Sequence, residues 1–244
     1  MVRVETRDDI GERVVLVTLD RPERRNAVDH GTLVALRQAQ HRLAEARVVV
    51  LTGAPPAFCA GADLTGVEEG EFARLLGEVL RGFTTLDAVV VAAVDGAALG
   101  AGTQLAIAAD LRVATPASRF GIPAARLGLV VDHWTVERLA REVGWSVARS
   151  MLLAAETYDA ERLHASGAVH RLGDLEAALA WAAELAALAP LTVAGHKVAL
   201  ERSGGPPAVD ELVEAARSRA WASADAAEGR AAFLEKRPAR FTGS

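Results

Sequence analysis

The 244-residue sequence contains a single cysteine, Cys59, so it cannot form an internal disulfide bond and gives no sign of secretion. It has no excess of basic residues: the formal net charge is −5, whereas a general nucleic-acid binder needs a basic surface. It also has no long hydrophobic run, since the longest uncharged stretch, residues 48–62, is too short for a bilayer and contains Gly53, Pro55 and Pro56. The first residues carry charges of both signs, unlike a signal peptide. These absences predict a soluble, cytoplasmic protein with no membrane span and no nucleic-acid partner.

The overall composition is that of a globular protein, with 51% hydrophobic and 24% charged residues. The length suits one large domain, or one domain with a helical appendage. A chain of this size buries roughly 70% of its unfolded surface, so it needs no disulfide or metal to stabilise a core. The histidines are dispersed without the spacing of metal ligands, and we therefore expect no metal site.

Strand and helix patterns alternate in the N-terminal half, which predicts an α/β fold with helices packed over the sheets. The C-terminal half is alanine-rich and predominantly helical in pattern, with one weak strand signal at 168–170. The expected strands are 13–19, 47–52, 88–94 and one beginning at 111–114. The expected helices are 29–46 with Asp29 as N-cap, 68–86, 98–109, 134–143, 146–154, 175–188, 190–200, 208–227 and 229–235.

The chain is expected to consist of a core, residues 1–190, and a C-terminal helical arm, residues 191–244. The sequence Gly204-Gly205-Pro206-Pro207 is a candidate hinge within this arm. An arm of this kind packs either on its own core or against a neighbouring subunit, and we favour the neighbour.

Two turns of very small residues stand at junctions between a strand and a helix: 57–64 and 96–102. Such residues let a ligand approach the backbone and meet free amide N–H groups. Two amides that converge on one oxygen would form an oxyanion hole, which stabilises negative charge on a carbonyl. Small residues at these junctions can also serve packing alone. Neither turn contains a GxGxxG or GK[ST] motif, so neither predicts a nucleotide site.

Six motifs occur in order along nearly the whole chain: 19–27, 50–53, 58–64, 95–102, 109–112 and 232–237. In this combination the sequence resembles the enoyl-CoA hydratase/isomerase (crotonase) family. The resemblance implies a crotonase-type spiral of ββα units with a C-terminal α-helical trimerisation region. It also implies a fatty acyl-CoA thioester as ligand, no cofactor beyond that coenzyme A thioester, and a homotrimer or a hexamer built as a dimer of trimers.

The resemblance also implies roles for individual residues. The backbone amides of Ala62 and Ala101 would hold the thioester carbonyl. Asp63 could instead cap a neighbouring segment, and Arg24 could be a solvated surface charge. The residues that would contact the CoA or acyl portion are Arg24, Ala60, Asp63 and Leu64, together with Phe233 and Lys236 from the arm.

The sequence departs from the family at its two catalytic positions. Family hydratases use two glutamates to hold a water molecule and move its proton, and Gln104 and Ala124 occupy those positions here. Neither side chain can act as a general acid or base, and each such group contributes about 10²–10⁴-fold to a rate.

Asp132 is the one candidate catalytic residue, because it matches the position of a nucleophilic aspartate in related aryl-CoA dehalogenases. Those relatives also need an aromatic residue where this chain has Ala124. Asp132 could react, hydrogen-bond a ligand, or cap the helix that begins near Trp134. The expected lining of the pocket is Gln104, Ala124, Leu127, Asp132, His133 and Trp134.

The sequence as a whole is most similar to actinobacterial members of the family that lack the glutamates and bind or deliver acyl-CoA. We therefore expect an acyl-CoA-binding protein of fatty-acid metabolism without efficient hydratase activity, with a possible protein partner in fatty-acid synthesis. The alternative is an active hydratase, isomerase or related CoA-thioester enzyme that uses a displaced group such as Asp132.

Overall fold

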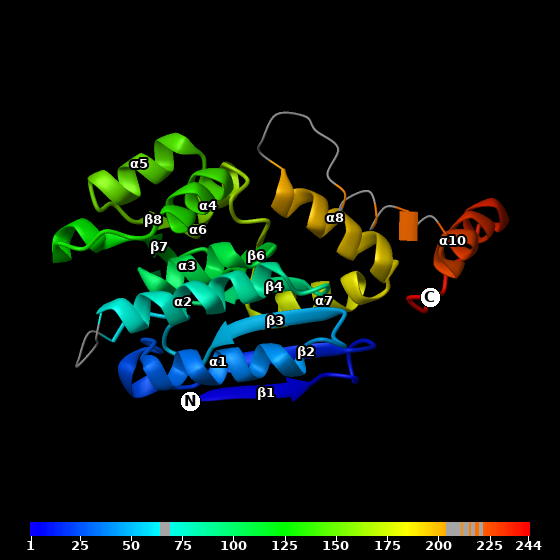
Figure 1. Ribbon diagram of the computed structural model, residues 1–244, viewed down its shortest axis with the longest axis horizontal. Coiled ribbons are helices and arrows are strands. Elements are labelled where there is room, and N and C mark those ends of the chain that lie inside the picture. The colour runs from blue at the N-terminus through cyan, green and yellow to red at the C-terminus, as the bar shows by residue number, and fades with distance from the viewer. Residues whose placement is uncertain (64–68, 204–210, 212–214, 216–217, 220–221) are drawn as a thin grey trace.

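The computed structural model describes the chain except residues 64–68, 204–210, 212–214, 216–217 and 220–221, and except the side chains of Glu69, Arg230, Phe233 and Leu234 (Figure 1). Its larger sheet has six strands in the order β1-β2-β3-β4-β6-β9, parallel except for the pair β1–β2. The strands are β1 Val2–Thr6, β2 Val14–Leu19, β3 Val48–Gly53, β4 Val89–Val94, β6 Leu111–Ala114 and β9 Arg171–Leu172.

Both faces of this sheet are buried at the strands β2, β3 and β4, which explains why these strands are hydrophobic at almost every position. On β2, Val15, Val17 and Leu19 face one core, which the helices α1 to α5 complete. The alternate residues Val14 and Leu16 face a second core, which small alanines of α7 close. The helices are α1 His30–Arg42, α2 Glu69–Thr84, α3 Ala101–Ala108, α4 His133–Val143, α5 Trp145–Leu153, α6 Ala160–Ala165, α7 Leu175–Ala186, α8 Pro190–Arg202 and α10 Ala224–Glu235, with 3₁₀ turns η1 Pro22–Arg24 and η2 Pro123–Leu127.

A second sheet of three short strands, β5 (Ala97–Leu99), β7 (Arg119–Gly121) and β8 (Tyr158–Asp159), stands beside the first. The chain therefore runs from a long strand through a short strand into a helix, as in β4-β5-α3, and this is the expected ββα unit. The prediction of a helix from residue 98 is wrong at its start. Residues 98 and 99 pair with β7, and α3 begins only after Gly100, whose φ of +52° turns the backbone.

The starts of α1 and α4 agree closely with the sequence, because an aspartate caps each of them. Asp29 accepts a hydrogen bond from the backbone N–H of Thr32 at 2.7 Å, and Asp132 accepts one from Thr135 at 3.1 Å. The helix expected to reach residue 46 ends at Arg42. The weak strand signal at 168–170 is displaced, since the strand that pairs with β6 is β9, at 171–172.

Helix α8 is tied to the core by a buried lysine. Lys197 is 6% exposed and its Nζ donates to the carbonyls of Phe83 and Ala88 at 3.0 and 2.9 Å, and to Asp110 at 2.7 Å. Burial lowers the pKa of Lys197, and the Asp110 carboxylate opposes that effect. The beginning of the proposed arm at residue 191 is thus packed on its own core.

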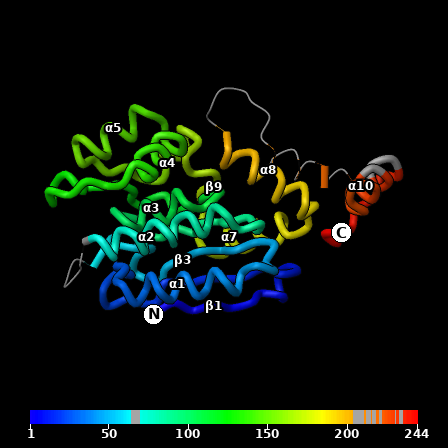
Figure 2. Tube along the Cα trace, in the orientation of Figure 1, coloured from blue at the N-terminus to red at the C-terminus, as the bar shows by residue number. Residues whose placement is uncertain are grey.

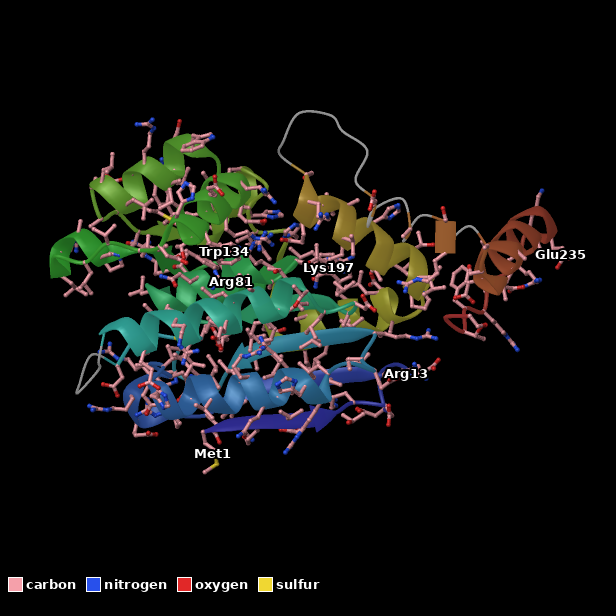
Figure 3. All side chains as sticks on the ribbon, in the orientation of Figure 1. Met1, Arg13, Arg81, Trp134, Lys197 and Glu235 are labelled. Carbon is pink, nitrogen blue, oxygen red and sulfur yellow. The ribbon has the colours of Figure 1, made fainter. Side chains whose placement is uncertain are left out.

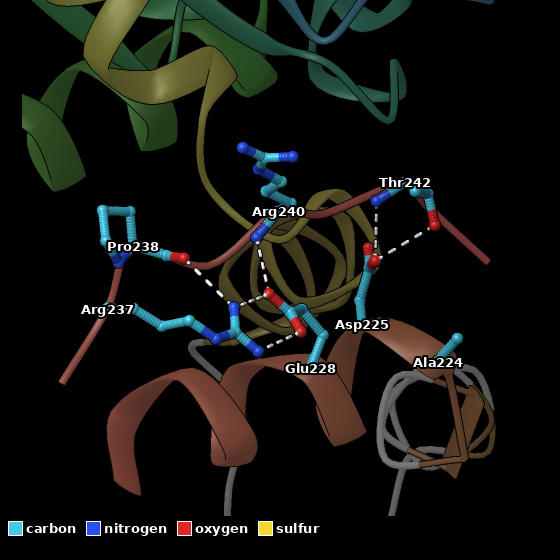
Figure 4. Close-up of a pocket in the computed structure, with 7 residues that line it drawn as sticks. All are labelled: Ala224, Asp225, Glu228, Arg237, Pro238, Arg240 and Thr242. Atoms are coloured by element: carbon cyan, nitrogen blue, oxygen red, sulfur yellow. Dashed lines mark hydrogen bonds and ion pairs between the residues drawn. The ribbon is translucent and has the colours of Figure 1, made fainter. Parts of the chain in front are cut away.

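The last helix, α10, lies at the end of the molecule opposite α5 (Figures 1 and 2). A hollow of about 600 Å³ separates α10 from the C-terminal tail (Figure 4). Its acidic side chains bind that tail: Glu228 accepts from Arg237 and from the N–H of Arg240, and Asp225 accepts from the N–H of Thr242. These hydrogen bonds attach the C-terminal tail to α10 across the hollow. The candidate hinge at 204–207 lies outside the described residues.

Within the described part of the chain, no single helix has both the length and the apolar character to cross a membrane. Helices α7 and α8 have that length and apolar character only when they are taken together, and a bend of 109° separates the two helices.

Candidate functional site

The two glycine-rich turns lie side by side. Cys59 and Ala98 form an isolated parallel bridge, in which the N–H of Cys59 donates to Ala97 O at 2.9 Å and the N–H of Leu99 donates to Cys59 O at 3.0 Å. A Cβ at Gly102 would stand 2.1 Å from the carbonyl oxygen of Cys59, so only glycine allows α3 to approach the first turn this closely.

This contact brings two unused backbone amides to one place. Ala62 bridges Val28, but the bonds of that bridge run from Val28 N–H to Gly61 O at 2.9 Å and from Asp63 N–H to Val28 O at 2.8 Å, which leaves the N–H of Ala62 free. Ala101 is the first residue of α3, where the N–H has no acceptor inside the helix. Neither amide has an acceptor among the described residues, and both residues line one cavity.

The cavity has a volume of about 370 Å³ and a mostly apolar wall. One side comes from the two turns, one from α2 and one from the segment between η2 and α4. The lining residues are Ala60, Gly61, Ala62, Phe72, Ala73, Leu76, Gly77, Leu80, Gly100, Ala101, Gln104, Ile122, Pro123, Ala124, Leu127, Leu129, Val130, Val131 and Asp132.

Only two described residues of this wall have polar side chains, Gln104 and Asp132. Gln104 lies in α3 and is 7% exposed. Its backbone N–H donates to Gly100 O at 3.0 Å, and its side-chain amide forms no hydrogen bond to another described residue. Asp132 is the N-cap of α4, and its Oδ1 is already bonded to Thr135. The helix-cap interpretation of Asp132 is therefore confirmed, and its place in the wall also leaves it within reach of a bound molecule.

The mouth of the cavity is apolar as well. Leu127 and Leu129 line the cavity and are still partly open to solvent, and Val130 is 95% exposed. Ala124, in η2, lies deeper and is half-buried. A hydrophobic chain could therefore enter over this rim without meeting a charge other than Asp132.

Two residues expected in the wall are elsewhere, which corrects the sequence interpretation. His133 is 84% exposed at its side chain and its Nε2 lies 3.6 Å from Glu137, on the outer face of α4. Trp134, in the first turn of α4, is partly buried and packs against the core that Val15, Val17 and Leu19 face (Figure 3). Successive residues of a helix point about 100° apart, so the position of Asp132 in the wall does not carry its neighbours there.

Arg24 and Asp63 meet at the edge of the site, but outside the cavity wall. Asp63 Oδ2 lies 3.6 Å from Arg24 Nε and 3.3 Å from Arg21 Nη2, and Arg21 Nη1 also lies 3.1 Å from Asp29. Arg21 was not among the site residues expected from the sequence; it stands in the turn Asp20-Arg21-Pro22 and is mostly buried. In this structure Asp63 fixes the first turn, and the exposed Arg24 side chain remains accessible from solvent. Leu64 lies outside the described residues.

The two arm residues are not at the cavity of their own chain. Lys236 is exposed and directly follows α10, and Glu235 beside it lies far from Trp134 in Figure 3. The Phe233 side chain is outside the described set. Either residue could reach a cavity only in another copy of the chain or after a movement of the arm.

The single cysteine is inert at this site. Cys59 is fully buried, and burial raises the pKa of its thiol to about 11. Among the described residues, no three histidine, cysteine, aspartate or glutamate side chains gather as a metal site would require.

Comparisons with known proteins agree on one family. The family profile described as "Enoyl-CoA hydratase/isomerase" matches residues 9–244. The Mycobacterium tuberculosis protein named "Probable enoyl-CoA hydratase echA6" is 41% identical over 240 residues, which cover 96% of this chain and 97% of that protein. The "2,3-dehydroadipyl-CoA hydratase" of Escherichia coli is 34% identical over 95% of this chain and 96% of its own.

Solved structures show the same fold. The crystal structure of enoyl-CoA hydratase EchA1 from Mycobacterium marinum superposes with a TM-score of 0.82 and 37% identity, covering 100% of this chain and 99% of that one. The enoyl-CoA hydratase from Bacillus anthracis superposes with a TM-score of 0.87 at 27% identity, covering 100% and 99%. The expected crotonase-type fold is therefore confirmed.

Proposed function

This chain belongs to the enoyl-CoA hydratase/isomerase family, and we propose that it binds fatty acyl-CoA thioesters without hydrating them efficiently. The observation that carries the proposal is the wall of the 370 Å³ cavity. It contains two free amides, from Ala62 and Ala101, but its described residues include no carboxylate other than the capping residue Asp132.

Binding is supported by the backbone and by the apolar wall. A thioester carbonyl that accepts hydrogen bonds from both amides would be held as in an oxyanion hole, and the N-terminus of α3 adds its positive dipole there. The acyl chain would then follow the apolar wall toward Leu127 and Leu129. Each methylene that leaves water contributes about 0.8 kcal/mol.

Weak or absent hydration is supported by what occupies the two proton-handling positions. Gln104 and Ala124 both line the cavity, yet neither can take up or release a proton near neutral pH. A water molecule in this cavity would meet the Gln104 amide without being activated by it.

Asp132 supports the second candidate function, an active enzyme with a displaced acid or nucleophile, because it lies in the same wall. Against this role, its Oδ1 caps α4 through Thr135 N–H, and a carboxylate used in this way is constrained in its motion. Turnover that disappears in the variant Asp132→Asn would establish the alternative.

The assembly and the partners follow from the family in the same proposal. Trimers, or hexamers of paired trimers, would let the arm of one subunit bring Phe233 and Lys236 to the CoA of another, beside Arg24 and Ala60. A lysine at that place would pair with a CoA phosphate. A protein that binds acyl-CoA without reacting with it could deliver the acyl group to a protein of fatty-acid synthesis.

Calorimetry with saturated acyl-CoA esters from C4 to C16 tests the binding proposal, with crotonyl-CoA hydration measured on the same sample. Affinity should rise about fourfold per added methylene until the pocket is full, because ~0.8 kcal/mol corresponds to that factor. Equal affinity at every length would mean that only the CoA portion is held. No binding at all would remove the proposal.

The variant Ala101→Pro is the matched test of the amide. Proline is tolerated at the first position of a helix and removes one N–H, so the fold should persist while thioester binding weakens. Binding of free CoA, which has no thioester carbonyl, should not change and serves as the control.

A further inference from the structure

A smaller cavity, of about 160 Å³, lies at the end of the large sheet where the parallel strands β2, β3 and β4 begin. Its wall includes Arg13, Arg47 and Asp87, which stand just before these three strands (Arg13 is labelled in Figure 3). The turn between α7 and α8 and the C-terminal tail complete the wall. The two glycine-rich turns follow the opposite ends of β3 and β4, and the 370 Å³ cavity beside them shares no described lining residue with the smaller one. The smaller cavity is therefore a separate site.

Arg47 brings to this cavity a buried donor that has no acceptor. Its side chain is 8% exposed, and its two terminal nitrogens donate to Ala186 O at 3.0 Å and to Phe241 O at 2.9 Å. The third donor, Nε, is buried, and none of the described residues accepts a hydrogen bond from it. Buried donors are almost always paired, because an unmade hydrogen bond in the interior is costly. Since Arg47 lines the smaller cavity, the missing acceptor should come from the contents of that cavity.

The charge of Arg47 also lacks a close partner. Among the described residues, the one carboxylate within 4 Å of this guanidinium is that of Glu12, at 3.5 Å, and the Glu12 side chain is 61% exposed. A buried guanidinium is stabilised best by a carboxylate that accepts its hydrogen bonds directly. A water molecule could pair with Nε but would leave the charge as it is. A carboxylate inside the cavity would satisfy the donor and the charge together.

The rest of the wall limits which carboxylate fits. The volume equals that of roughly five water molecules at ~30 Å³ each, which suits a carboxylate on a short chain. Glu45 and Asp87 are exposed residues of the same wall, and they would repel a second negative charge on a ligand. The chain of the ligand would meet an aliphatic surface. That surface consists of Ala44, Ala46, Val89, Leu185, Leu188, Pro190, Leu191, Val193 and Ala194.

We propose that the smaller cavity binds a short aliphatic monocarboxylate. One carboxylate oxygen accepts a hydrogen bond from Nε of Arg47, and the chain packs against the leucines at the junction of α7 and α8. The C-terminal tail takes part in the site through Thr242 and Gly243. The inference does not depend on acyl-CoA binding, because the two cavities are built from different residues.

The test is calorimetry of the full chain with butanoate, butanamide and butanedioate. Butanoate should bind with a Kd of about 0.1–10 mM, the range for a ligand of so few atoms. Butanamide has the same shape without the charge and should bind about three- to tenfold more weakly, because charge-assisted hydrogen bonds are roughly twice as strong as neutral ones. Butanedioate should also bind more weakly than butanoate, since its second carboxylate would meet Glu45 and Asp87.

Variants locate the binding. Arg47→Gln removes Nε and the charge, and should abolish the preference for butanoate over butanamide. Leu188→Trp leaves Arg47 intact and fills the cavity with a larger side chain, so it should weaken butanoate binding about tenfold or more. Leu153→Trp is the matched control, because Leu153 is an exposed leucine of α5 outside both cavities. Ala101→Pro alters only the 370 Å³ cavity and should bind butanoate as the wild type does.

Each contrary result overturns the proposal. If butanamide or butanedioate binds as tightly as butanoate, the ligand class is wrong. If butanoate binding survives in Leu188→Trp and is lost in Ala101→Pro, the ligand occupies the other cavity. If the wild type does not bind butanoate above the expected range of concentrations, the cavity holds water alone. Decanoyl-CoA binding, measured on the same samples, should be unchanged in Leu188→Trp, so the failure of this inference and that of the proposed function are distinguishable. Leu188→Trp and its control decide the site even if Arg47→Gln does not fold.

Discussion

Introducing two carboxylates into the cavity wall, by Gln104→Glu together with Ala124→Glu, should raise the hydratase activity of this protein far above that of the wild type. Both positions line the cavity that holds the amides of Ala62 and Ala101, so the new groups would face a bound enoyl thioester. The two amides proposed to hold the thioester carbonyl would be unchanged, because they belong to the backbone.

The magnitude follows from the environment of each position. A glutamate at position 104 would be more than nine-tenths buried, as Gln104 is, and desolvation would raise its pKa toward the range of a general acid. One at position 124, half-buried in η2, would stay closer to its ordinary pKa and could act as a base. Each group contributes about 10²–10⁴-fold, so the double variant should exceed the wild type by roughly 10⁴-fold or more, and each single variant should gain far less.

The assay measures hydration of crotonyl-CoA through the decrease in absorbance of the enoyl group. Gln104→Glu combined with Ala124→Gln is the matched control, because it keeps the volume at position 124 and removes the second titrating group. The reasoning is refuted if the wild type already turns over near the enzyme median of about 10 s⁻¹. It is also refuted if the double variant binds crotonyl-CoA and gains no more than the control.

Three further outcomes are expected. Lys197→Met should lower the free energy of unfolding by about 3–5 kcal/mol in urea titrations, because it leaves Asp110 and two buried carbonyls without their shared donor. A loss under about 1 kcal/mol would contradict the role of Lys197 in tying α8 to the core. Cys59 should resist alkylation at pH 8 in the folded protein and react on unfolding, since its thiol is buried with a pKa of about 11. Asp132→Ala should lower the free energy of unfolding by about 0.5–2 kcal/mol, because the cap of α4 is lost. Calorimetry should show an acyl-CoA affinity within about twofold of the wild type. A large loss of affinity would make Asp132 a ligand-binding group.

The sequence was sufficient for the elements whose stability is local or whose burial is complete. The β-branched runs of β2, β3 and β4 are hydrophobic on both faces, and this pattern fits only a strand covered on both sides. Asp29 and Asp132 signal helix starts because their side chains bond amides only three residues later. The small residues of the two turns likewise indicated that the backbone can be approached closely there, and the bridge between Cys59 and Ala98 shows that the two turns lie against each other.

The sequence did not suffice where pairing with distant residues decides the structure. The short strand β5 reads as the start of a helix, and only its partner β7, some twenty residues later, makes it a strand. β1 carries charges at alternate positions because it is an edge strand with one exposed face, so its pattern is weak. The placement of His133 and Trp134 depends on the rotation of α4 about its axis, which core packing determines.

In this cavity, binding and chemistry depend on different kinds of atoms, and this difference explains how one could persist without the other. The amides of Ala62 and Ala101 are positioned by backbone contacts, above all by the close approach of Gly102 to Cys59, so no substitution at positions 104 or 124 need disturb them. Proton transfer, in contrast, requires particular side chains, and a single substitution removes each one. The Gln104 carboxamide keeps the cavity wall polar at one point and does not ionise there.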